Sequence, residues 1–279
     1  MILTYKDHKG IKKIENLVKH APVGDVEGAK DEYKAEREIL DAIRDYRYKE
    51  IGVELINKIK DHFLKNDKVS SPTEYEFHKD WYIGDPYKTF MDFFTRKLTL
   101  KKYAEIEKSA QKCEMVIPNE CFIEGLDSFK NTEKIVRLKQ KSPDVLKDLK
   151  KFDIDIPNYD YIDMKLLVTY YHRIHMPVTG TIKRMVPIEG KDDFFGKNSL
   201  WILEIETKKS PVYLVLVGES TIQDFDYLVE KDTPLNVFDT IGYFNWGSQT
   251  LIFYNPKDYD DIQIKEKTTK FVGDCIFKK

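Results

Sequence analysis

Two histidines that lie close together in the chain are the residues best suited to acid–base chemistry. His172 and His175 are two of six histidines, and they fall in the run Tyr-His-Arg-Ile-His-Met-Pro over residues 171–177. An imidazole can take up or release a proton near neutral pH. In an extended segment, positions three apart face opposite sides of the strand, so the two rings could do different jobs. The alternative is two ordinary histidines, one buried and hydrogen-bonded and one exposed.

A glycine–serine pair near the C-terminus is the second feature that could carry chemistry. Gly247 and Ser248 stand between two strand-like runs. Such a pair is common in turns, so a simple hairpin connection is the alternative to a chemical role.

Short β-rich runs separated by Pro, Gly and Asp must position these residues. Because they follow one another without long helices between them, they indicate a mainly antiparallel core. We expect strands over residues 178–186, 200–207, 212–217, 241–244 and 250–254.

The N-terminal third has a helical pattern instead. Between residues 26 and 64, six apolar residues recur at spacings of four or eight and form one stripe: Ile39, Ile43, Ile51, Leu55, Ile59 and Phe63. The stripe indicates helices packed on the rest of the protein, or alternatively a surface that touches a membrane or a partner. Residues 90–98 also read as helical. The expected fold class is α+β, with a helical region over 1–85 packed on a mainly antiparallel, β-rich catalytic core over 86–279.

Composition narrows the functional classes. Hydrophobic residues make up 41% of the 279 positions, enough for a packed core, and the formal net charge of -2 gives no reason to expect nucleic acid as a partner. Three cysteines without paired spacing argue against a disulfide framework or a zinc knuckle, and favour a reducing compartment. The apolar run over 212–217 is far too short to span a membrane, and residues 1–7 lack a signal-like stretch. We expect a cytoplasmic protein, with peripheral membrane contact left open.

The chain resembles the phosphatidylserine decarboxylase family over about residues 90–259. The run from Tyr171 to Pro177 matches that family's Tyr-His-Arg-x-His-x-Pro and is the most specific signal. Residues 93–98 are similar to its Phe-Phe-x-Arg-x-Leu. Further matches in the same order are Gly180, Val217-Gly218, Gly242-Tyr243-Phe244 and Gly247-Ser248.

The resemblance implies an enzyme, a carboxy-lyase, that matures by cutting itself between Gly247 and Ser248. Ser248 Oγ would attack the Gly247 carbonyl, and elimination would leave a pyruvoyl group, the cofactor, at the start of a short chain over residues 248–279. Serine needs an adjacent base that is itself held by a carboxylate. In the family, the second histidine of the motif, here His175, and an upstream acid fill these roles. The first histidine, His172, would assist proton handling while the pyruvoyl carbonyl takes up electrons as carbon dioxide leaves.

Several positions depart from the family pattern. The upstream acid sits in Pro-Ala-Asp-Gly, and its best counterpart here is Glu120 in Pro118-Asn119-Glu120-Cys121. The extra methylene moves the carboxylate by about 1.5 Å unless the backbone compensates, and the alternative is that Glu120 is an ordinary surface acid. Further departures are Tyr170 for an Asp, Gln249 for Thr or Ser, Asn198-Ser199-Leu200 for Asn-Glu-Arg, and a shortened stretch over 187–196.

Three other sequence patterns give little evidence of a function. The spacing of His172 and His175 is not that of a helical zinc pair, so no metal is expected. Residues 190–198 have five residues between their glycines and end on Asn198, unlike a phosphate-binding loop. A basic run over 137–151 fits a solvated helix face, with weak attraction to anionic lipid headgroups as the alternative.

Three functions remain open at this point. The first is decarboxylation of phosphatidylserine to phosphatidylethanolamine at a membrane surface. The second is decarboxylation of a soluble amino acid by a member of the same family, which the shortened stretch and the high charge favour. The third is an uncleaved, non-catalytic relative that acts as a binding or scaffold protein, which Glu120 and Gln249 motivate. A homodimer is the default expectation for the assembly.

Overall fold

The computed structural model describes the chain except for residues 1–3, 23–28, 71–75, 129–148, 155, 157, 191–197, 219–221 and 248. The basic run at 137–147, residues 191–196 of the shortened stretch and the predicted cleavage serine therefore lie outside the described residues. The chain divides into two compact units, residues 1–99 with 168–170, and residues 100–167 with 171–279. The predicted boundary between residues 85 and 86 stays a prediction.

The first unit is mainly helical. It contains α1 (Tyr5–His20), α2 (Ala29–Arg44), α3 (Val53–Ser70), the 3-10 turn η1 (Lys79–Trp81), β1 (Tyr82–Ile83), α4 (Phe90–Phe94) and β2 (Lys97–Leu98). Helix α1 begins with a capping box in which Thr4 Oγ1 accepts from the Asp7 N–H and the Asp7 carboxylate accepts from the Thr4 N–H. All six residues of the predicted apolar stripe are buried, at 0–7% exposure. The stripe therefore packs inside the protein and does not form an exposed membrane-binding face.

The prediction of one helix over residues 90–98 was wrong in its second half. Helix α4 ends at Phe94, and Lys97–Leu98 pairs with β1 as a short strand. Arg96 explains the change, because its buried guanidinium donates to Phe93 O at 3.2 Å and to Thr169 O at 2.6 Å. The contact with Thr169 is 73 residues away in the chain, and local propensity cannot reveal such a partner.

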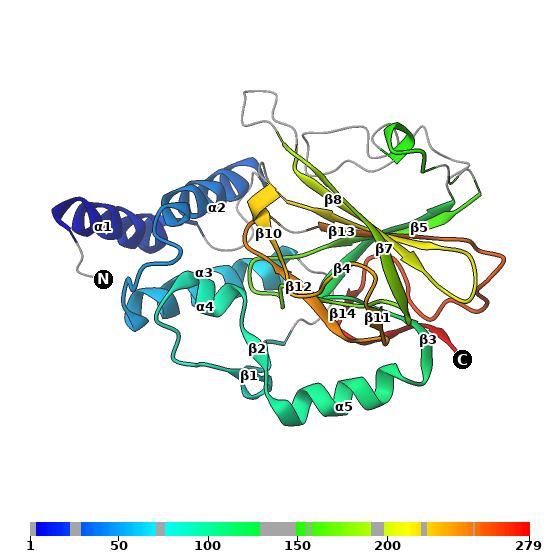
Figure 1. Cartoon of the computed structure of the whole chain (residues 1–279). Helices are drawn as coiled ribbons and strands as arrows, with labels where there is room; N and C mark the ends of the chain where they lie inside the picture. The colour runs from blue at the N-terminus through cyan, green and yellow to red at the C-terminus, as the bar shows by residue number, and fades with distance from the viewer. Residues whose placement is uncertain are drawn as a thin grey trace. The chain divides into compact units, whose positions relative to one another are not determined.

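The second unit begins with helix α5 (Leu100–Ala110) and continues as an antiparallel β-structure (Figure 1). Over the described residues its largest sheet has the order β11-β7-β8-β9-β13-β5-β4-β14. These strands are β11 (Pro234–Leu235), β7 (Gly180–Ile188), β8 (Leu200–Glu206), β9 (Val212–Val217), β13 (Gln249–Tyr254), β5 (Asp160–Lys165), β4 (Cys121–Ser128) and β14 (Thr269–Lys270). Two smaller sheets contain β10 (Phe225–Tyr227), β12 (Thr240–Phe244) and β6 (Arg173–His175), and β15 (Cys275–Lys278) with β3 (Cys113–Val116).

The five predicted strands and the α+β class are confirmed. The predicted runs correspond to β7, β8, β9, β12 and β13, with ends shifted by a few residues. Every residue of β9 and β13 is buried, which is why both read as nearly continuous apolar runs. One face of the large sheet packs in a cluster with Leu149, Ile154 and Ile156. Within the described ranges, no helix is both long enough and apolar enough to cross a bilayer.

The expectation that the cysteines form no disulfide was wrong. Cys113 and Cys275 are joined by a disulfide across β3 and β15, and their Cα atoms are 5.7 Å apart. The two residues are 162 positions apart in the chain, so their spacing gave no sign of the pairing. Cys121 is a free, buried cysteine. The cysteine content consequently no longer argues for a reducing compartment.

Candidate active site

Strand β6 carries the histidine motif and pairs with the strand that leads to the predicted cleavage junction. His175 lies opposite Thr240 in β12, and Arg173 lies opposite Tyr243. The pairing continues beyond the strand, because the Phe244 N–H donates to His172 O at 3.0 Å. Gly247 follows Phe244 by three residues. The fold thus places the motif beside the approach to the junction.

The segment that carries Glu120 runs along the other side of the histidine motif. The His175 N–H donates to Pro118 O at 2.8 Å, and the Tyr171 N–H donates to Glu120 Oε2 at 2.8 Å. Glu120 is 2% exposed, so the alternative of an ordinary surface acid was wrong. The carboxylate thus holds the backbone at Tyr171, the residue before His172. Its predicted role as the orienting acid of self-cleavage stays a prediction.

The His175 ring is enclosed by aromatic residues and has a hydrogen-bond partner on each nitrogen. It stacks on Phe238 with ring centroids 4.3 Å apart and on Tyr171 at 5.7 Å. Its Nδ1 lies 2.8 Å from Phe238 O and 3.3 Å from Thr240 Oγ1, and its Nε2 lies 3.1 Å from the Tyr171 hydroxyl. A carbonyl can only accept, so Nδ1 carries the proton and Nε2 presents its lone pair to Tyr171. The partner of Nδ1 is thus a backbone carbonyl where sequence reasoning expected a carboxylate.

Burial decides the charge of His175. The ring is completely buried, and desolvation is the main cause that lowers its pKa to about 4. The Phe238 carbonyl opposes this shift and nearby Arg173 adds to it. His175 is therefore neutral at pH 7, as a general base must be.

His172 is also completely buried, so the alternative of one buried and one exposed histidine was wrong. The carbonyl of His172 is used by the β12 pairing described above. Arg173, between the histidines, lies 5.1 Å from the centre of the Tyr243 ring, and burial lowers its pKa.

Phe238 is a site residue that sequence reasoning missed. Its φ angle is +77°, a conformation that bulky residues rarely adopt, and it orients the carbonyl that meets His175. The Tyr103 hydroxyl donates to the same carbonyl at 3.2 Å. No sequence motif marks a residue whose contribution is its backbone oxygen.

Backbone hydrogen bonds to Asp224 hold the turn that follows β12. The N–H groups of Asn245 and Trp246 both donate to Asp224 O, at 2.7 and 3.3 Å. The buried Asp224 carboxylate in turn accepts from Ser199 Oγ at 3.2 Å. Gly247 has a φ of +69°, which glycine adopts without strain. These contacts hold the chain as far as Trp246, two residues before Ser248.

Gln249, the departure just after the predicted cleavage site, has a defined partner. Its Nε2 donates to Asp163 Oδ1 at 2.7 Å, from β13 to the neighbouring β5. Asp163 is buried, and desolvation raises its pKa to about 6 although the Gln249 bond opposes the shift. Asp163 was not predicted from the sequence, because an acid inside a strand gives no local signal.

A sequence model of the phosphatidylserine decarboxylase family matches residues 90–278, about two thirds of the chain. The chain therefore belongs to the phosphatidylserine decarboxylase family. The match includes Glu120, both histidines and the Gly247–Ser248 junction.

Individual relatives carry the same name. Phosphatidylserine decarboxylase proenzyme 2 of Komagataella phaffii is 28% identical over 222 residues, which are 69% of this chain and 22% of the relative. The proenzyme of Shewanella denitrificans is 30% identical over 92 residues, 29% of this chain and 30% of the relative. That of Francisella philomiragia is 26% identical over 114 residues, 29% of this chain and 41% of the relative. The matches thus span less than half the length of each of these relatives.

Proposed function

We propose that this protein is a pyruvoyl-dependent decarboxylase that matures by cutting itself between Gly247 and Ser248. The observation that carries the proposal is the pairing of β6 with β12. It aligns a neutral, buried His175 and the Glu120-bound segment with the strand that leads to the junction. The relatives are named as proenzymes, which supports a maturation step in this family.

The proposed cleavage uses Ser248 as the nucleophile. Ser248 Oγ gives its proton to the Tyr171 hydroxyl, which passes its own proton to His175 Nε2. The serine oxygen attacks the Gly247 carbonyl carbon, and the peptide C–N bond breaks to leave an ester and a free amine. Removal of the Ser248 Cα proton then breaks the ester C–O bond, so Gly247 leaves as a carboxylate. Water replaces the nitrogen of the resulting dehydroalanine, ammonia departs, and a pyruvoyl group remains. Within this scheme, Tyr171 and Phe238 hold the His175 ring, while the Glu120 carboxylate holds the Tyr171 N–H.

The residues next to position 248 fit a small polar group. Thr250 is completely buried, and its Oγ1 has no hydrogen-bond partner among the described residues, so it can donate to a carbonyl. Gln249 is fixed by Asp163, which limits the movement of the new chain end. A pyruvoyl group at this position would supply a carbonyl that accepts electrons when a substrate with an amino group loses carbon dioxide. His172 is the proposed residue for moving a proton during that step.

The proposed substrate is phosphatidylserine, in line with the family name. Peripheral membrane contact would suit a lipid substrate, and helix α1 offers basic groups for it. Lys9, Lys12 and Lys13 are exposed and line a hollow of about 660 Å³ on the first unit. Such groups attract anionic headgroups.

Carbon dioxide release tests the function and the substrate together. We expect the purified protein to decarboxylate phosphatidylserine in mixed vesicles, and Ser248→Ala to be inactive. Release of carbon dioxide from free amino acids without lipid would favour the alternative of a soluble amino-acid decarboxylase.

An intact chain that consumes neither substrate would favour the alternative of a non-catalytic binding or scaffold protein. The scaffold alternative is motivated by the residue itself, because Gln249 stands where the family has Thr or Ser. Co-sedimentation with phosphatidylserine vesicles, compared with a variant in which the three lysines are changed to Glu, checks the membrane contact.

A further inference from the structure

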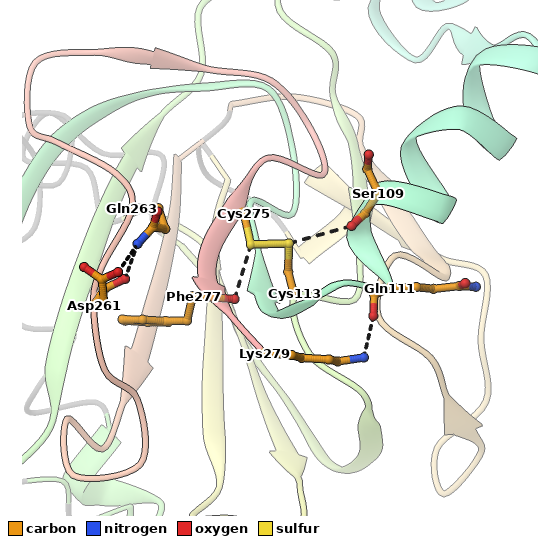
Figure 2. The surroundings of a disulfide bond; sticks show 8 residues. All are labelled: Ser109, Gln111, Cys113, Asp261, Gln263, Cys275, Phe277 and Lys279. Carbon is orange, nitrogen blue, oxygen red and sulfur yellow. Dashed lines mark hydrogen bonds between the residues drawn. A yellow bond between two sulfur atoms is a disulfide. The ribbon is translucent and has the colours of Figure 1, made fainter.

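The disulfide joins two parts of the chain that the proposed cleavage would separate. Cys113 in β3 precedes the Gly247–Ser248 junction, and Cys275 in β15 follows it. Figure 2 shows the bond between the adjacent strands. A cut at the junction would leave the two cysteines on different chains.

The two strands that carry the cysteines are also held together by backbone pairing. Strands β3 and β15 pair antiparallel, with Cys275 opposite Val116 and Lys278 opposite Cys113. The Lys279 N–H also donates to Lys112 O at 3.3 Å. The Cα separation of 5.7 Å lies within the normal range for a disulfide, about 4.4–6.8 Å.

The remaining cysteine does not compete for the pairing. Cys121 is completely buried, and burial is the main cause that raises the pKa of its thiol well above the usual value. Disulfide exchange requires a thiolate with access to the bond, and Cys121 offers neither. Cys275 is half-buried and therefore more accessible to small thiols and disulfides.

We propose that the mature protein consists of two chains linked covalently by Cys113–Cys275. This inference rests on the proposed cleavage at Gly247–Ser248. The bond forms when the two thiols lose two electrons and two protons to a small-molecule disulfide such as glutathione disulfide, which becomes two thiols.

The link secures strands that the site depends on. The short chain would contribute β13 to the middle of the large sheet, and β14 and β15 to pairs with β4 and β3. Just after β3, Ile117 donates to Asp274 O and accepts from the Gly273 N–H, both at 2.9 Å. The next residue, Pro118, accepts from His175. A covalent link prevents loss of the chain that supports this segment.

Intact mass measured with and without reductant tests the link. The purified protein is denatured in the presence of excess alkylating agent, so that every free thiol reacts, including the buried Cys121. We expect the wild type to give one species without reductant and two chains, ending at Gly247 and beginning at residue 248, with reductant. Cys275→Ser and Cys113→Ser should give two chains in both conditions, whereas Cys121→Ser should behave like the wild type. Phe277 O lies 3.3 Å from Cys275 Sγ, so a serine hydroxyl there has an acceptor.

The outcomes separate this inference from the cleavage on which it rests. Two chains from the wild type without reductant would overturn the link and leave the cleavage intact. A single full-length species in both conditions, as expected for Ser248→Ala, would overturn both proposals. In that case the number of alkylated cysteines still reports whether the disulfide exists, since one thiol reacts if it does and three react if it does not.

Discussion

The surroundings of His175 suit the proton transfer that we propose for it. Its stacking partners shield the ring, and the Phe238 carbonyl selects the tautomer in which Nε2 accepts from the Tyr171 hydroxyl. Protonation of this buried ring is unfavourable in the folded protein. The pKa of His175 is therefore coupled to the stability of the fold.

That coupling predicts a pH dependence. The pKa of His175 falls from about 6.5 in the unfolded chain to about 4 in the folded protein, so only the unfolded chain binds the proton between these values. Stability should therefore decrease as the pH falls from about 6.5 towards 4, by up to about 1.4 kcal/mol per pH unit. In a Ser248→Ala background, His175→Gln should reduce this dependence, as measured by urea unfolding. Parallel curves for the two proteins from pH 7.5 to 4 would show that His175 is not the group responsible.

Gln249 and Asp163 give a matched pair of variants at the junction. Gln249→Ala removes the donor to Asp163 Oδ1, whereas Asp163→Asn retains an oxygen that can accept it. If this bond fixes the residue after Ser248, Gln249→Ala should slow self-cleavage roughly tenfold or more, from the worth of a hydrogen bond to a charged group. Asp163→Asn should slow it less. Cleavage followed on reducing gels after synthesis in a cell-free extract gives both rates, and equal rates for the two variants would rule out the bond as the cause.

The residues of the candidate site could be identified from the sequence, but their contacts could not. The motif identified His172 and His175, and the family pattern directed attention to Glu120. Phe238 and Asp163 gave no signal, because one acts through its backbone oxygen and the other through a partner 86 residues away.

At the scale of elements, the site depends on close packing between short strands. Strand β12 pairs with β10 on one side and with β6 on the other. Gly242 allows this approach, because a Cβ atom at its position would lie 2.4 Å from Asp226 O and from the Phe225 ring. The glycine of the Gly-Tyr-Phe match therefore has a packing role.

Gly242→Ala should consequently destabilise the second unit, by about 1–3 kcal/mol or more, and slow self-cleavage by displacing the approach to Gly247. Gly125→Ala is the matched control, because it also lies in a strand and its Cβ would find the nearest atom at 4.0 Å. Thermal unfolding of both variants checks the prediction. Equal melting temperatures would contradict the packing role of Gly242.

The strands themselves were predictable because buried strands consist mainly of apolar residues that are consecutive in the sequence. Strand β9 is apolar throughout, and turn residues bound it on both sides. The end of α4 and the Cys113–Cys275 pair were not predictable, since each depends on residues distant in sequence.

At the scale of the whole molecule, strands from the segment after the junction pair with strands from the part before it. Strand β13 lies between β9 and β5, and β15 is tied to β3 by hydrogen bonds and the disulfide. A cut between Gly247 and Ser248 would leave these pairings in place. The fold is therefore compatible with a protein that is made as one chain and acts as two.

The intact mass of the fully reduced, denatured protein tests this account most directly. We predict two chains, one ending at Gly247 and one spanning residues 248–279, the second lighter by one ammonia than its sequence requires and without a free amino terminus. Ser248→Ala should remain a single chain. A wild-type protein that also keeps its full-length mass would contradict self-cleavage, and with it the pyruvoyl-dependent activity.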